Sequence, residues 1–138
     1  LARALAPLPV RVRLIDSRAE ELAQAGYVPQ TLTALPEAEV RRAAPGAAFV
    51  IVTHDHALDF LIAVEALARG DTGYVGMIGS ASKRAAFLRH AARAGVDAGR
   101  LTCPIAAHAP RDKRPEVIAA FAAAEIMAAL MTHARVPA

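Results

Sequence analysis

The sequence predicts a single α/β domain, residues 1–138, in which an open parallel sheet lies between two layers of helices. Apolar segments of strand length alternate along the chain with segments of helical character. The run at residues 49–52 is apolar without alternation, which is typical of a strand covered on both faces. Alanine at 35 positions and only six aromatic residues favour helices packed closely on a sheet.

The first half of the chain contributes two strands and several short elements. Residues 1–6 have the character of a final helical turn, which Pro7 stops. Residues 10–15 alternate and are predicted as a strand that ends at Asp16. The intervening segments are predicted as a short helix or turn at 17–25, a short extended piece at 27–32 and a short exposed helix at 36–43.

The second half repeats the strand–helix pattern. The predicted elements are a helix at 57–69, a strand at 73–78, a helix from Ser80 to about Ala94, a short strand at 101–105 and a last helix from Pro115. The apolar stretch 117–131 of the last helix is 15 residues long. Because a membrane crossing needs roughly 20 apolar residues, we expect this helix to be buried in the domain.

Charge and cysteine content exclude several classes of protein. The 16 basic residues are scattered and offset by 13 acidic ones, which argues against a nucleic-acid partner. The single cysteine excludes an internal disulfide framework and suits a reducing cytoplasm. No basic-then-apolar leader is present, so we expect a cytoplasmic protein with no membrane partner.

Polar residues follow three predicted strands, where ligands bind on open α/β sheets. The candidate contacts are Asp16, then Thr53, His54 and Asp55, then Gly79 and Ser80 with Lys83. In dinucleotide-binding folds, an acid at the position of Asp16 bonds a ribose, but the preceding glycine fingerprint is absent here. Asp16 could equally cap the turn at Ser17.

The turn after residues 49–52 offers a hydroxyl, two imidazoles and a carboxylate at residues 53–56. His54 and His56 are two residues apart with an acid between them, which matches no common zinc spacing, so we expect no metal. A ligand contact is one interpretation of this turn. The alternative is that Asp55 only caps the following helix.

The Gly79–Ser80 turn joins a strand end to a helix start. Glycine permits close backbone approach, free N–H groups begin the helix and Lys83 adds charge, which together predict an anion or phosphate cradle. Alternatively, Ser80 only caps the helix and Lys83 is solvated.

The remaining reactive side chains have weaker patterns. Cys103 is interpreted as a lone buried thiol, and His90 and His133 as packing or surface residues. His108 belongs to a charged loop that either flanks a ligand or is only solvated. No Ser-His-Asp order with an elbow sequence is present, so nucleophilic hydrolysis and a catalytic residue are not expected.

Taken in order, several motifs resemble one known family. They are Leu-Ile-Asp16-Ser-Arg18, Thr53-His-Asp55-His-Ala-Leu-Asp59, Tyr74-Val-Gly76-Met-Ile-Gly79-Ser80, and the last helix from Arg114-Pro115-Glu to Glu125-Ile. The chain resembles the C-terminal domain of the XdhC/CoxI family, the xanthine dehydrogenase accessory proteins. The resemblance covers nearly the whole chain, and it implies a Rossmann-like fold that lacks its first strand and glycine loop in this chain.

The resemblance implies a protein that binds molybdenum cofactor, assists its sulfuration with a cysteine desulfurase and inserts it into a xanthine dehydrogenase-like apoenzyme. Carried over by position, the contacts are Asp16, Thr53, His54, Asp55, Gly79, Ser80 and Lys83. The chain departs from the family pattern after the last strand. Ala106 stands where members tend to have glycine, so easy access to positive φ is lost.

Two further functions and two structural expectations accompany this hypothesis. An NAD(P)-dependent oxidoreductase suits the position of Asp16 equally well, and a purely structural interaction domain is a third possibility. If the first strand is missing, the strands at 10–15 and 49–52 should flank a gap and keep open edges. The weakly polar helix 117–131 also predicts a homodimer, because one sheet surface covers only one stripe of a helix.

Overall fold

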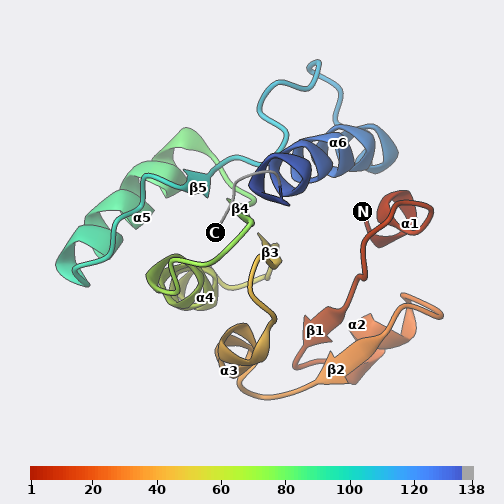
Figure 1. Cartoon of the computed structure of the whole chain (residues 1–138), viewed down its shortest axis with the longest axis horizontal. Coiled ribbons are helices and arrows are strands. Elements are labelled where there is room, and N and C mark those ends of the chain that lie inside the picture. The colour runs from red at the N-terminus through yellow and green to blue at the C-terminus, as the bar shows by residue number, and fades with distance from the viewer. Residues whose placement is uncertain (135–138) are drawn as a thin grey trace.

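The computed structural model describes residues 1–134 as six helices alternating with five strands (Figure 1). The strands are β1 (Leu14–Asp16), β2 (Gln30–Leu32), β3 (Ala48–Ile51), β4 (Tyr74–Met77) and β5 (Leu101–Thr102). The helices are α1 (Ala2–Leu5), α2 (Ala19–Ala23), α3 (Pro36–Arg42), α4 (His56–Ala68), α5 (Ala81–Arg93) and α6 (Pro115–Ala134). The last four residues of the predicted domain lie outside the described residues.

Every strand pair in the described chain is parallel, which confirms the predicted α/β class. β1 pairs with β2, and β3, β4 and β5 form a second sheet in that order. Ile51 of β3 stands opposite Met77 of β4, so both strands end at the same edge of the sheet. A helix follows β1, β3 and β4 in each case, which is the usual connection between parallel strands.

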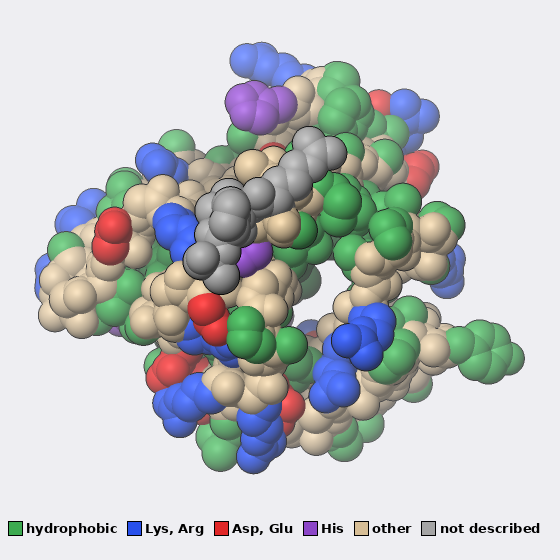
Figure 2. Space-filling view, in the orientation of Figure 1, with side chains coloured by type: hydrophobic (Ala, Val, Ile, Leu, Met, Phe, Trp, Pro, Cys, Tyr) green, Lys and Arg blue, Asp and Glu red, His purple; other side chains and the backbone are tan. Residues whose placement is uncertain are grey.

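The strands form two separate sheets, and the interruption lies between β1 and β3. These two strands belong to different sheets, and among residues 1–134 no strand pairs with the free edge of either. Figure 2 shows the surface hollowed between β3 and the segment that leads into β1. The predicted gap with open edges is therefore present.

The division also explains two predictions that were wrong. The strand expected at residues 10–15 is reduced to Leu14–Asp16, because extended backbone persists only where a neighbour accepts its hydrogen bonds. The sequence predicts that the strand at 49–52 is covered on both faces, and the structure does not bear this out. Phe49 and Val50 are only half-buried, and Val52 is 58% exposed.

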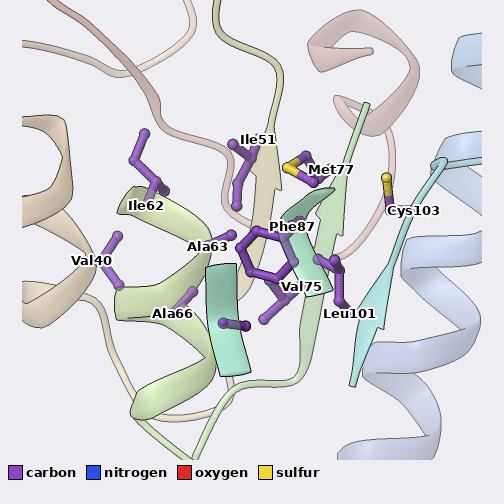
Figure 3. Packing of buried hydrophobic residues seen from close by; sticks show 11 residues of the cluster. Val40, Ile51, Ile62, Ala63, Ala66, Val75, Met77, Phe87, Leu101 and Cys103 are labelled. Atoms are coloured by element: carbon purple, nitrogen blue, oxygen red, sulfur yellow. The ribbon is translucent and has the colours of Figure 1, made fainter. Parts of the chain in front are cut away.

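The core lies between β3, β4, β5 and the two helices α4 and α5 (Figure 3). All four residues of β4 are buried, and Met77 is fully enclosed. Phe87 of α5 is also fully enclosed and meets the ring of Phe60 edge-on at 5.2 Å between centroids. Alanines of α4 at positions 63 and 66 face this cluster, which lets the helix pack closely on the sheet as the composition predicts.

Helix α6 is less buried than the sequence predicts. Only Ala122, Ala123 and Ile126 are buried, whereas Phe121 and Met131 are more than 40% exposed. The reason is that the main contacts of α6 with other helices and strands are those with α1 and β4, which leave much of its surface uncovered. By length and composition alone, α6 is the one helix of the described chain that could cross a membrane, a test that core helices of soluble proteins also pass.

Candidate functional site

Two turns meet at the carboxyl ends of β3 and β4. The Thr53–Asp55 turn follows β3, and the Gly79–Ser80 turn follows β4. The pairing continues beyond the strands, because Ile78 N–H donates to the Ile51 carbonyl at 3.1 Å. The parallel register therefore brings the two candidate turns to one edge of the sheet, as expected.

The Thr53 turn is built by short-range hydrogen bonds. Thr53 Oγ1 accepts from the Asp55 N–H at 3.1 Å. Asp55 Oδ1 in turn accepts from the N–H groups of Ala57 and Leu58 at 2.8 and 3.4 Å. The capping interpretation of Asp55 is thus confirmed, while its side chain and that of His54 stay exposed.

The Gly79–Ser80 turn begins α5 with a neutral cap. Ser80 Oγ accepts from the Lys83 N–H at 3.2 Å, which confirms Ser80 as the cap. A Cβ on Gly79 would lie 2.6 Å from Cδ of Lys83. Glycine is therefore required here by the stem of Lys83, a reason that the sequence does not reveal.

The charge of Lys83 is turned into the protein. Lys83 is 9% exposed and Asp59 of α4 is fully buried. Lys83 Nζ donates to Asp59 Oδ2 and, at 2.8 Å, to the carbonyl of Ile78. The alternative that Lys83 is solvated is wrong, and the positive charge expected at the turn is neutralised internally.

Asp59 is the buried residue at this edge of the sheet that sequence reasoning underrates. Its Oδ1 accepts from Thr53 N–H at 3.0 Å and lies 2.6 Å from Thr53 Oγ1. One carboxylate thus holds the Thr53 turn with one oxygen and Lys83 with the other. The available signal was an acid within the first turn of a largely apolar helix.

Asp16 lies apart from this network. It ends β1 in the other sheet, and both of its oxygens accept from the Arg18 guanidinium at 3.0 Å. The Arg18 side-chain bond lowers the pKa of the Asp16 carboxyl. No hydrogen bond or ion pair of residues 1–134 connects Asp16 with either turn, so the two sheets place the predicted contacts in two groups.

Cys103 follows β5 and is 7% exposed, which confirms the predicted buried thiol. Burial raises its pKa, although Lys83 and Arg84 oppose this effect. A thiol with a raised pKa is a poor nucleophile at neutral pH. In addition, no group of histidine, cysteine or acidic residues in the described chain is arranged to hold a metal ion.

The loop after β5 keeps the conformation for which glycine is suited. Ala106 has φ +59° and is buried, the one described residue other than glycine with positive φ. His108 in the same loop is exposed. The departure from the family pattern therefore changes the residue but not the left-handed backbone that the loop requires.

Comparison with models of known protein families identifies a match. The family model described as the XdhC Rossmann domain matches residues 1–126, which is most of the chain. That span includes both turns, Asp16, the buried Asp59–Lys83 pair and the loop at Ala106. No curated protein matches the chain. The resemblance drawn from the motifs is thus confirmed, and the chain belongs to the XdhC family, to which it contributes a Rossmann domain.

Proposed function

We propose that this protein binds the molybdenum cofactor and hands it to a xanthine dehydrogenase-like apoenzyme. The observation that carries the proposal is the pair of turns at the ends of β3 and β4, held to each other through Asp59 and Lys83. Membership in the XdhC family supports the same conclusion. Open α/β sheets bind their ligands at this edge.

The start of α5 is the part of the edge best suited to the phosphate of a cofactor. Its cap, Ser80, is neutral, and its first turn contains no acidic residue. The first N–H groups of a helix lack partners within the helix, and Arg84 is exposed on the same turn. The start of α4 is different, because the Asp55 carboxylate already occupies its N–H groups.

Apolar side chains lie beside the polar groups. Val52 and Ile78 directly follow β3 and β4 and are 58% and 50% exposed. Exposed apolar groups at a ligand-binding edge suit the face of a planar ring system such as a pterin. The proposed contacts are therefore Thr53, His54, Asp55, Gly79 and Ser80, with Asp16 from the other sheet and Lys83 acting from inside.

A carrier role agrees better with these residues than catalysis does. The single cysteine is buried and its pKa is raised, so it is not suited to carry sulfur. Sulfur would then come directly from a cysteine desulfurase while this protein holds the cofactor. We further propose that the protein acts in the cytoplasm and as a homodimer.

The test is an anaerobic titration of the protein with molybdenum cofactor, NAD and NADP, followed by fluorescence or calorimetry. Saturable binding of the molybdenum cofactor, with weak or no nicotinamide binding, is the expected result. Tight binding of NAD or NADP without pterin binding would overturn the proposal in favour of an oxidoreductase. Binding of none of the three would favour a structural interaction domain.

A further inference from the structure

The buried ion pair connects elements that are distant in sequence. Asp59 lies on α4 and Lys83 lies on α5, 24 residues further along the chain, and both residues are buried. Asp59 also binds the backbone of the Thr53 turn, and Lys83 binds the carbonyl that precedes Gly79. One continuous chain of hydrogen bonds therefore runs from the end of β3 to the end of β4.

Stability alone does not account for this pair. Taking two charges out of water costs about as much as their attraction returns, so apolar residues of the same volume often serve equally well. The polar groups are nevertheless all satisfied, since no buried side-chain nitrogen or oxygen in the described residues lacks a partner. A fully satisfied polar network fixes geometry more sharply than apolar contacts do.

The stem of Lys83 adds a second constraint on the same turn. It lies against Gly79, with its Cδ 2.6 Å and its Cβ 3.2 Å from where a side chain would begin. The backbone of the Gly79–Ser80 turn thus packs directly against the aliphatic part of Lys83. The preceding residue, Ile78, accepts a hydrogen bond from the Lys83 amine. Movement of Lys83 would move the turn.

We propose that Asp59 and Lys83 are positioning residues that clamp the two turns at the separation which the cofactor requires. This inference rests on the proposed function for its ligand, whereas the clamp itself is a property of the free protein. Lys83 acts through the turns and does not contact the ligand. The cationic side chain available to the ligand is Arg84, which is exposed one residue further along α5.

The first measurement uses the ligand-free protein and follows backbone amide exchange by NMR. In the double variant Asp59→Leu/Lys83→Met, the Thr53 amide should exchange at least about tenfold faster, while the amides of β4 keep their rates. The matched control is Arg41→Gln/Glu65→Gln, which removes an exposed ion pair between α3 and α4. That control should leave Thr53 unchanged. Unchanged exchange at Thr53, or equal acceleration everywhere, would overturn the clamp.

A milder variant separates the two halves of the clamp and covers the case in which the apolar double variant does not fold. Asp59→Asn/Lys83→Met keeps an acceptor for the Thr53 N–H but removes the link to the Ile78 carbonyl. Exchange at Thr53 should stay near the wild-type rate, and affinity for the molybdenum cofactor should fall about tenfold or more. Affinity within twofold of wild type would overturn the positioning role.

Salt dependence distinguishes positioning from direct contact. Because the pair is neutral as a whole and lies inside, its removal should weaken cofactor binding without changing the dependence on salt. Arg84→Ala should reduce that dependence. A reduced dependence in the Lys83 variants would overturn the assignment and make Lys83 a ligand contact. If the wild-type protein binds no cofactor at all, the proposed function fails, and the exchange measurement still decides the clamp.

Discussion

The hydrogen bond from Tyr74 to Glu125 gives the clearest quantitative prediction. Tyr74 of β4 is 6% exposed, and its hydroxyl donates to Glu125 Oε1 of α6 at 2.7 Å. Few side chains of α6 are buried, so this bond is a principal tie between the helix and the sheet. A hydrogen bond to a charged group contributes about 1.5–3 kcal/mol, and Tyr74→Phe should destabilise the protein by about 2 kcal/mol.

The chain supplies its own control for this change. Tyr27, the only other tyrosine, is fully exposed, so Tyr27→Phe should change stability by less than about 0.5 kcal/mol. Urea unfolding measures both variants. With a slope of about 2 kcal/mol per molar, the midpoint for Tyr74→Phe should fall by about 1 M. Equal midpoints for the two variants would refute the reasoning.

The same bond predicts a pH dependence at the alkaline end. Burial, followed by the bond to Glu125, raises the pKa of the Tyr74 phenol. A group whose pKa is raised on folding contributes its full stability below its unfolded pKa, here about 10, and loses it as the pH rises further. Wild-type protein should therefore lose stability above about pH 10, and Tyr74→Phe should lack this part of the loss.

Three further predictions concern the thiol, the loop and the last helix. Because burial raises the pKa of Cys103, its alkylation by iodoacetamide should be at least about 100-fold slower than in urea, and Cys103→Ala should keep cofactor binding. In urea unfolding, the free energy of unfolding of the Ala106→Gly variant should exceed that of the Ala107→Gly variant by about 1 kcal/mol. The reason is that, of these two alanines, only Ala106 has a positive φ. Sedimentation at micromolar concentration should give a dimer that Phe121→Glu converts to a monomer, because Phe121 is exposed on α6. A wild-type monomer would contradict the dimer.

Elements with local signals were predictable from the sequence. Asp55 and Ser80 begin α4 and α5 as caps, and both act within three residues along the chain. Gly70 and Gly95 have positive φ just after those helices end, as helix-stopping glycines do. Local patterns of this kind are sufficient because the atoms that interact are neighbours in sequence.

Burial was less predictable, because it depends on what covers each face. The apolar run at Phe49 has the composition of an enclosed strand, but the free edge of β3 leaves it half-buried. Helix α6 is apolar on most sides, and the sequence does not show which of these sides is covered by another element. The Asp59–Lys83 pair was unpredictable for a related reason, since it requires α4 and α5 to lie side by side on the sheet.

The N-termini of α4 and α5, which lie at the edge where β3 and β4 end, differ in electrostatic potential. At the start of α4, the Asp55 carboxylate closes the N–H groups and offsets the positive end of the helix dipole. At the start of α5, the neutral Ser80 leaves that positive end uncompensated, and Arg84 adds to it. The Asp59–Lys83 ion pair carries no net charge, so it does not cancel the difference in potential between the two helix starts. We therefore propose that a ligand with an anionic end and a neutral, hydrogen-bonding end binds with the anion at the start of α5 and the neutral end toward the Thr53 turn, an arrangement that would suit a pterin that bears a phosphate.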